Sequence, residues 1–178
     1  STYLKRHMEY CMTLLFPLLI YSQSKAEEHF AEGNALLQRG FYQKAVDAYT
    51  HAIQQNPRYV EAYINRGYAY DFLIDYKQAA ADYTQAIALD LNIALVYLNR
   101  GLAYANLDQK EKASADYDRA IQLNPQFAEA YCNRAILRQH QDQFQEAIAD
   151  YQRVIECAPC SEAGILAKQM LAHFEEKN

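Results

Sequence analysis

Residues 94–127 read ALVYLNRGLAYANLDQKEKASADYDRAIQLNPQF, and this stretch decides the fold because the chain repeats it with variation. An offset of 34 residues superimposes one series of small residues, which are Gly33, Gly67, Gly101 and Ala135. Further along each copy, the same offset superimposes an alanine, a tyrosine and a small apolar residue: Ala45, Tyr49 and Ala52; Ala79, Tyr83 and Ala86; Ala113, Tyr117 and Ala120; Ala147, Tyr151 and Val154. Self-similarity at a fixed period of this length indicates a repeat architecture.

The spacing within each copy predicts two helices joined by a turn. Steps of four and three residues place the alanine, the tyrosine and the second small residue on one helical face. Another series ends each unit where a helix must stop, with one departure from proline: Pro57, Leu91, Pro125 and Pro159. Because one hairpin cannot bury both its apolar faces, neighbouring hairpins should stack into a solenoid. The expected fold class is therefore all-α.

The composition agrees with an all-α chain and argues against some partners. The 178 residues are 51% hydrophobic, and 5 Gly and 4 Pro are too few for the turns of a many-stranded sheet. A net charge of −5, without a basic run or a basic stripe interleaved with aromatic residues, argues against nucleic acid. The 4 cysteines are too few for a disulfide scaffold and leave the redox compartment open.

On these small residues, tyrosines, alanines and prolines at a 34-residue period, the chain resembles the tetratricopeptide repeat (TPR) family. The family's usual tryptophan early in the first helix is replaced by His29, Tyr63, Tyr97 and Tyr131. The resemblance implies a right-handed superhelical solenoid that acts as a protein-protein interaction scaffold or adaptor, not an enzyme. It divides the chain into an N-terminal segment, four repeats and a C-terminal capping helix: 1–25, 26–59, 60–93, 94–127, 128–161 and 162–178.

Comparison of the copies also predicts an ion pair within three hairpins. Arginine precedes the small residue in repeats two to four, and aspartate follows 16 residues later: Arg66 and Asp82, Arg100 and Asp116, Arg134 and Asp150. Repeat one carries Glu32 and Ala48 instead, so both partners are absent together. This joint absence predicts that each arginine pairs with the aspartate of its own repeat.

The resemblance implies that one face of each first helix lines a concave groove that binds an extended peptide or helix. Asn65, Asn99 and Asn133 share one slot of this face, where an asparagine ladder could bind a peptide backbone because a carboxamide both donates and accepts hydrogen bonds. The alternative is that these amides cap or bridge neighbouring helices. The surrounding slots are mostly apolar, and the predicted peptide-binding residues are Asn34, Asn65, Asn99, Asn133, Phe30, Ile64, Tyr68, Phe72, Leu98, Leu102 and Ile136.

The basic clamp with which some TPR domains bind the acidic C-terminus of heat-shock chaperones is not expected here. The clamp needs cations to hold a terminal carboxylate by charge-assisted bonds. The clamp spans three repeats. Aligned with repeats one to three, its basic positions hold Phe30, Leu95 and Asn99. Aligned with repeats two to four, they hold Ile64, Glu129 and Asn133. We therefore expect a protein or peptide partner other than a chaperone C-terminus.

Residues 1–25 lie outside the repeats and contain the most hydrophobic run, Cys11–Tyr21. As a helix this run would reach only about 16 Å, against a bilayer core of about 30 Å. The favoured interpretation is an amphipathic helix that covers the open face of repeat one. The alternatives are a membrane-associated or self-assembling factor whose segment docks on a membrane, on a second protomer to give a homo-dimer, or in its own groove. A cytoplasmic location is favoured, unless residues 8–24 act as a signal or anchor and make the protein secreted, periplasmic or membrane-associated.

Signals for catalysis are weak. Cys157 and Cys160 form a C-x-x-C spacing, but Pro159 is the terminating proline of its repeat, and Cys157 stands where other copies have a core leucine. The sequence contains no glycine-rich phosphate loop, no G-x-S-x-G motif and no histidine spacing suited to a metal. We therefore predict no catalytic residue, no metal and no cofactor.

Overall fold

The computed structural model describes residues 25–176, which form nine helices. The predictions for residues 1–24, namely a covering helix, a signal, an anchor or a dimer contact, lie outside the described residues. The helices are α2 (Lys25–Gln38), α3 (Tyr42–Gln55), α4 (Val60–Phe72), α5 (Tyr76–Leu89), α6 (Ala94–Asn106), α7 (Lys110–Leu123), α8 (Ala128–His140), α9 (Phe144–Cys157) and α10 (Glu162–Glu176).

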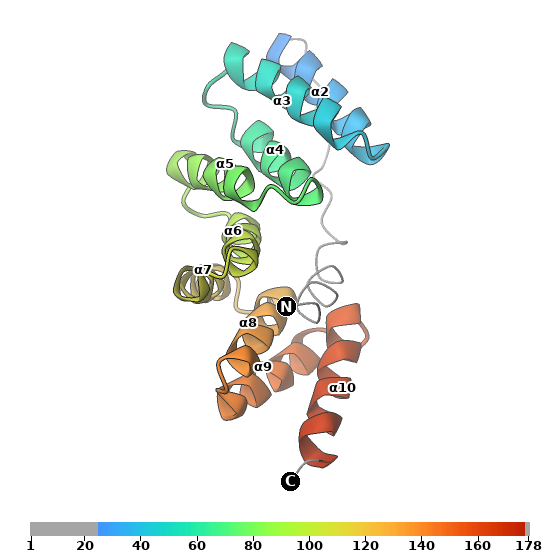
Figure 1. Cartoon of the computed structure of the whole chain (residues 1–178), viewed down its shortest axis with the longest axis vertical. Coiled ribbons are helices and arrows are strands. Elements are labelled where there is room, and N and C mark those ends of the chain that lie inside the picture. Colours follow the sequence, from blue (N-terminus) through green and yellow to red (C-terminus); the bar gives the residue numbers. More distant parts are fainter. Residues whose placement is uncertain (1–24, 177–178) are drawn as a thin grey trace.

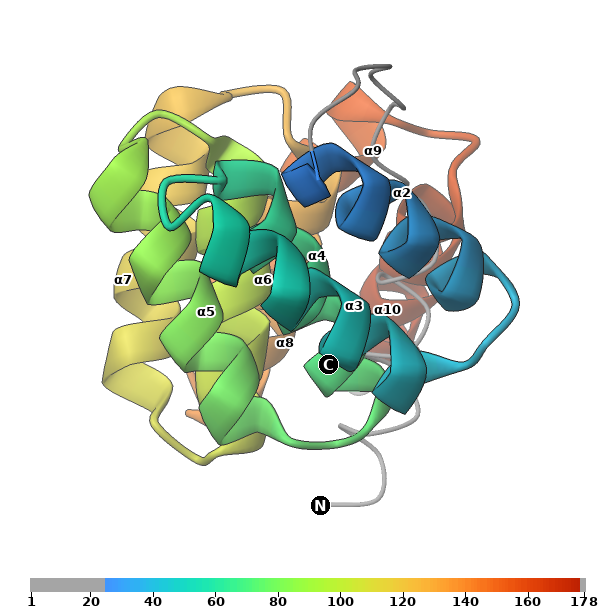
Figure 2. The same cartoon turned by 90° about the horizontal axis from the view of Figure 1, so that it is seen from above.

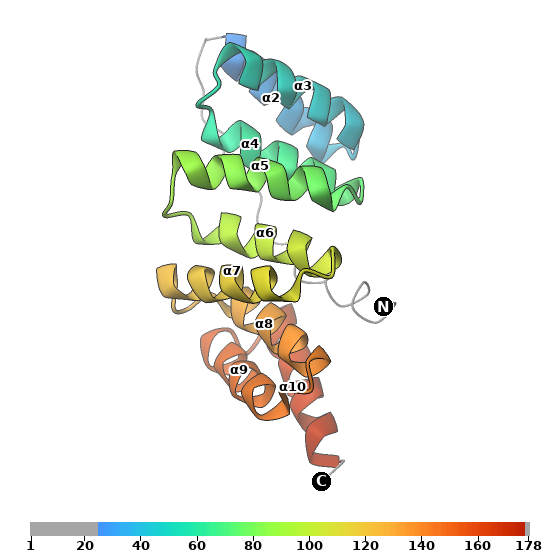
Figure 3. The ribbon, with the colours of Figure 1, turned by 60° about the vertical axis from the view of Figure 1, so that its left-hand side comes forward.

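The helices pair into four hairpins that stack along one axis, followed by α10 (Figure 1). The pairs are α2 with α3, α4 with α5, α6 with α7, and α8 with α9, and each hairpin packs on the next. Figure 3 shows the hairpins in succession from the N-terminal to the C-terminal end of the described chain. The expected all-α helical solenoid is confirmed.

Each hairpin turns at a residue in the left-handed backbone region. These residues are Gly40, Ile74, Asp108 and Asp142, with φ of 77°, 61°, 57° and 58°. In every case the amide of the next residue bonds back to a carbonyl of the preceding helix, as Gln109 N does to Tyr104 O at 2.9 Å. This six-to-one bond ends the first helix and starts the return.

The small residues receive the tyrosine rings, as the repeat pattern predicts. A Cβ added to Gly33 would lie 2.5 Å from Cε1 of Tyr49, and one added to Gly67 would lie 2.8 Å from Cε1 of Tyr83. Real Cβ atoms essentially never come so near, so a side chain at these glycines would push the two helices of the hairpin apart. The tyrosines of all four repeats are fully or almost fully buried.

The predicted ion pairs are confirmed and have bidentate geometry. In repeat three, Nε and Nη2 of Arg100 each donate to an oxygen of Asp116 at 2.8 Å. Repeats two and four repeat this arrangement, with Arg66 on Asp82 and Arg134 on Asp150. The aspartates are buried and the arginines only slightly exposed, so these pairs differ from freely solvated surface pairs.

The same arginines also reach the preceding repeat, which the sequence comparison did not predict. Nη1 of Arg66 donates to Oγ1 of Thr50 at 3.0 Å, and Nη1 of Arg100 donates to Oγ1 of Thr84 at 3.2 Å. In repeat four the corresponding acceptor is a carboxylate, with Nη1 of Arg134 2.6 Å from Oδ1 of Asp118. Each arginine therefore joins its own hairpin and links it to the previous one.

The C-terminal helix α10 covers the apolar end of repeat four. Ala163, Ala167 and Met170 are buried in one cluster with Tyr151 and Val154 of α9. Phe174 adds a ring contact to Phe144 with centroids 5.9 Å apart. The apolar stripe of residues 162–176 thus packs against α9 and α8.

Candidate functional site

The first helices of the repeats form the inner side of the solenoid. They contact one another directly, α2 with α4, α4 with α6, and α6 with α8, in addition to their contacts within hairpins. Seen along the axis, α5 and α7 lie on the outside and α6 and α8 lie nearer the centre (Figure 2). The predicted groove residues belong to these inner helices.

Two of the predicted asparagines bind each other across the first two repeats. Oδ1 of Asn34 accepts from Nδ2 of Asn65 at 2.8 Å and from the hydroxyl of Tyr49 at 2.8 Å. Both asparagines are buried. At this level the amides bridge α2 and α4, which corresponds to the alternative role considered for them.

The other two asparagines are differently placed. Asn99 of α6 is half-buried. Asn133 of α8 is buried, and its Nδ2 donates to the carbonyl of Glu129 at 2.9 Å, which fixes the orientation of the amide. Oδ1 of Asn133 finds no donor among the described residues. A buried acceptor without a partner costs free energy.

Most of the predicted apolar groove residues are buried or half-buried and so offer little surface to a ligand. Phe30, Leu98, Leu102 and Ile136 are buried, and Ile64 and Tyr68 are half-buried. Phe72 alone among the predicted apolar residues is exposed, at 40%. The inner helices therefore use much of their apolar surface to pack against each other.

A buried carboxylate lies on α4 that the sequence did not single out. Oδ2 of Asp71 accepts from the hydroxyl of Tyr83 at 2.6 Å, and no ion pair reaches Asp71 within residues 25–176. Burial raises the pKa of Asp71 to about 7, against a smaller lowering by the Tyr83 hydrogen bond. The sequence signal was an aspartate at a slot where the other repeats have Leu37, Ala105 and Gln139.

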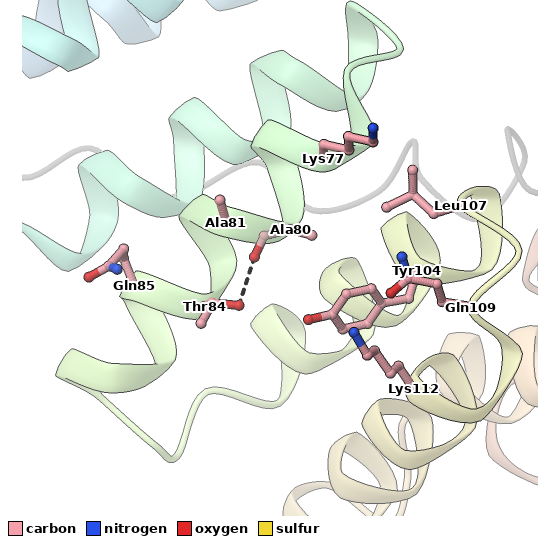
Figure 4. Close-up of a pocket in the computed structure, with 9 residues that line it drawn as sticks. All are labelled: Lys77, Ala80, Ala81, Thr84, Gln85, Tyr104, Leu107, Gln109 and Lys112. Atoms are coloured by element: carbon pink, nitrogen blue, oxygen red, sulfur yellow. Dashed lines mark hydrogen bonds between the residues drawn. The ribbon is translucent and has the colours of Figure 1, made fainter.

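An open cavity of about 390 Å³ lies on the outside, between repeats two and three. Figure 4 shows Lys77 and Thr84 from α5 facing Tyr104, Leu107 and Lys112 across it. Nζ of Lys112 lies 5.2 Å from the ring centroid of Tyr104, within cation-π range. Thr84 bonds to its own helix, donating to the carbonyl of Ala80 at 2.8 Å.

The described residues offer no group of three or more metal-ligating side chains. None of the helices within residues 25–176 combines the length and the apolar content needed to cross a bilayer. In the same part of the chain, Cys132, Cys157 and Cys160 are free thiols.

Comparisons with known proteins agree with the helical-repeat solenoid that the geometry defines. Models described as tetratricopeptide repeat match residues 101–172 and 60–93, and one described as TPR repeat matches residues 33–71. The TPR domain of Arabidopsis OM64 is 35% identical with a TM-score of 0.63, over 65% of this chain and 95% of that domain. No curated protein sequence matches the chain significantly.

Two further structures extend the comparison. The first TPR of Spaghetti (RPAP3), solved with the HSP90 peptide SRMEEVD, is 30% identical with a TM-score of 0.65, over 70% of this chain and 99% of that one. MamA is 24% identical with a TM-score of 0.71, over 86% of this chain and 87% of that one, which shows a likeness of fold alone.

The molecule is thus an all-α solenoid of the protein-interaction class. More particularly, the chain belongs to the tetratricopeptide repeat family. Proteins of this family are typically interaction modules, and the chain is a protein-interaction scaffold in that general sense.

Proposed function

We propose that the inner face of α6 and α8 binds an extended peptide of a partner protein, and that the chain works as an adaptor without catalytic activity. The observation that carries the proposal is the unpartnered Oδ1 of buried Asn133. A backbone N–H of a peptide in the groove would donate to it. Asn99, at the same slot one repeat earlier, would provide the next amide along the peptide.

The proposal assigns different roles to the asparagines along the groove. The mutual bond between Asn65 and Asn34 supports a bridging role in repeats one and two. Asn99 and Asn133 are the pair left for a ligand, with Ile64 and Tyr68 as half-buried apolar neighbours. Apolar contacts would then contribute most of the affinity and the amides would fix the register.

A peptide other than a chaperone C-terminus fits this face better. Spaghetti (RPAP3) was solved with the HSP90 peptide SRMEEVD, but this chain has Leu95 and Asn99 where the clamp needs cations. A terminal carboxylate placed there would lack its charge-assisted donors. We therefore propose that the ligand is recognised through its backbone and apolar side chains.

The test uses an array of acetylated and amidated peptides of random sequence, probed with the full chain and three variants. Asn99→Ala and Asn133→Ala should lose the peptides that wild type binds while unfolding at an unchanged or higher temperature. Asn65→Ala should lower the unfolding temperature, because it leaves Asn34 without a donor from α4. Equal binding by Asn133→Ala and wild type would refute the proposal. SRMEEVD with a free and with an amidated C-terminus serves as the control pair, and we expect no preference for the free acid.

A further inference from the structure

Four large hydrophobic side chains gather on two consecutive turns. Phe41 lies in the turn between α2 and α3, and Phe72, Leu73 and Ile74 lead into the turn between α4 and α5. Their exposed fractions are 44%, 40%, 38% and 64%. We call these four residues the turn patch.

An aromatic stack joins the two turns into one surface. The ring of Tyr42, which follows Phe41, stacks on Phe72 with centroids 4.4 Å apart and planes inclined by 5°. Tyr68 meets the same Phe72 ring edge-on at 4.9 Å. The patch is therefore continuous from repeat one to repeat two.

Ile74 is costly to the fold in two ways. It adopts φ of 61°, a conformation that a β-branched residue rarely takes, and it exposes an apolar side chain. The other repeats place Gly40, Asp108 and Asp142 at this slot, residue types that adopt such a conformation more readily. The turn itself does not require isoleucine, so the residue is better explained by a contact outside the described residues.

The other repeats show that the fold does not require an apolar turn edge. At the slots of Phe72 and Leu73, repeat four has His140 and Gln141, and repeat three has Asn106 and Leu107. The full apolar set is confined to the edge of repeats one and two. A surface that serves the fold alone would recur along the solenoid.

The rim of the patch is basic, although the whole chain is acidic. Cζ of Arg39 and Nζ of Lys44 lie 4.9 and 5.4 Å from the ring centroid of Phe41, and exposed Lys77 follows Ile74 in the first turn of α5. Within residues 25–176 none of these three cations forms an ion pair.

Two exposed carboxylates also lie near the patch, and each accepts a hydrogen bond from an amide. Asp75 caps α5 by accepting from the amide of Gln78 at 3.2 Å, and Asp47 accepts from Nε2 of Gln43 at 3.3 Å. Lys77 continues the basic rim to the cavity of Figure 4, where Lys112 adds a further cation without an ion pair in the described chain. The cations Arg39, Lys44 and Lys77 thus outnumber the carboxylates Asp75 and Asp47 around the patch.

We propose that the turn patch docks a segment of a partner protein that carries apolar side chains flanked by carboxylates. The apolar side chains would pack on Ile74, Leu73 and the Phe72 ring. The carboxylates would meet Arg39, Lys44 and Lys77, whose charges steer such a segment toward the patch. The turn patch includes neither Asn99 nor Asn133, so it adds a second binding surface to the proposed adaptor.

The test titrates the full ¹⁵N-labelled chain with an amphipathic peptide of about 14 residues, with leucine and phenylalanine on one face and glutamate on the other. Saturable amide shifts should gather in residues 39–44 and 72–77 and weaken with salt. A matched peptide with lysine in place of glutamate should bind at least about tenfold more weakly.

A double variant separates docking from folding. Leu73→Gln with Ile74→Asp installs the pair found in repeat four, so it should weaken binding at least about tenfold while the thermal midpoint stays equal or rises by about 2–4 °C. Ile165→Gln, which changes a side chain 51% exposed on α10, is the matched control and should bind as wild type does.

Four results would overturn the proposal. They are the absence of saturable binding, equal affinity of the double variant, shifts that gather on the side-chain amides of Asn99 and Asn133, and concentration-dependent shifts of the turn patch without peptide. The third would assign the acidic segment to the inner face, and the last would make the patch a contact between two copies of the chain.

Discussion

The tyrosine hydroxyls that occupy equivalent positions in the repeats donate to chemically different acceptors. Tyr49 donates to the amide of Asn34, Tyr83 to the carboxylate of Asp71, and Tyr151 to the amide of Gln139. An amide accepts such a bond at every pH, whereas a buried carboxylate must remain charged or bind a proton. Asp71 therefore gives repeat two a pH dependence that the amides do not give repeats one and four.

Asp71→Asn should remove this pH dependence. The folded-state pKa of about 7 lies above the ordinary value, so between about pH 4 and 7 the folded chain keeps a proton that the unfolded chain releases. Stability from this group is therefore present at low pH and is lost as pH rises, by up to about 1.4 kcal/mol per pH unit. Urea unfolding of both proteins from pH 5 to 8 should show that the free energy of unfolding of the variant increases relative to that of wild type as pH rises.

The hydroxyl of Tyr83 and the nearby ring of Tyr68 face Asp71, and both stay neutral over this pH range because burial raises the pKa of each. If the free energies of unfolding of Asp71→Asn and wild type differ by the same amount at every pH, Asp71 is not the source of the pH dependence.

Ile74→Gly should stabilise the fold by about 1 kcal/mol. Relief of the left-handed conformation gains about 1–2 kcal/mol, and the added freedom of the unfolded chain takes back up to about 1 kcal/mol. Little apolar burial is lost, because Ile74 is 64% exposed. Thermal unfolding measures the gain. Gly40→Ala, at the same slot with φ of 77°, is the matched control and should lose stability.

At the scale of the element, each hairpin of repeats two to four is stabilised by an arginine that bonds in two directions, and in repeat four Nη1 of Arg138 also donates to Asp150 at 2.7 Å. Hydrogen bonds to Asp116 raise the pKa of Arg100 more than burial lowers it. The third donor of the same guanidinium reaches Thr84 of the preceding hairpin. A lysine could not make these bonds together, because only the planar guanidinium presents its donors in a fixed fork.

A double-mutant cycle on Arg100→Ala and Asp116→Ala should give a coupling energy of about 1–3 kcal/mol, because both side chains are largely buried and the bonds are charge-assisted. Chemical denaturation of the four proteins supplies the values. Arg153 and Glu156 pair on the exposed surface of α9 and form the control cycle, which should couple more weakly than the buried pair. Equal coupling in the two cycles would mean that burial adds nothing to the bidentate pair.

The sequence predicted those features in which at least three copies use the same slots. The hairpins, the glycine sockets for the tyrosines and the arginine-aspartate pairs follow from the 34-residue period. The bond from Asn65 to Asn34 could not be predicted this way, because the two asparagines occupy different slots, 31 residues apart. Asp71 and Ile74 each stand once at their slot, so the comparison of copies said nothing of burial at one or backbone strain at the other.

At the scale of the whole molecule, the solenoid has unequal junctions. Of the three interfaces between consecutive repeats, the one between α7 and α8 is the smallest. The apolar core of the described residues forms three clusters, one over α2 to α4, one that reaches from α5 across this junction into α8, and one that reaches from α8 to α10. Because a solenoid is stabilised by nearest-neighbour contacts, a weak junction lets the terminal part open separately.

Repeat four and α10 should therefore exchange their amide hydrogens as one unit that opens more readily than α4 to α7. The contact from Arg134 to Asp118 crosses this junction, and the side chain of Asp118 is 49% exposed, so we expect it to contribute about 0.5–1 kcal/mol. Asp118→Ala should then speed exchange in α8, α9 and α10 by about twofold to fivefold and leave α4 and α5 unchanged. Exchange followed by mass spectrometry under native conditions measures both regions in one experiment.

Thr84→Ala removes the corresponding acceptor at the junction of repeats two and three and should have a smaller effect, since it breaks a single bond to a neutral hydroxyl. If Asp118→Ala instead speeds exchange equally along the chain, the repeats unfold together and the junction is no weaker than the others.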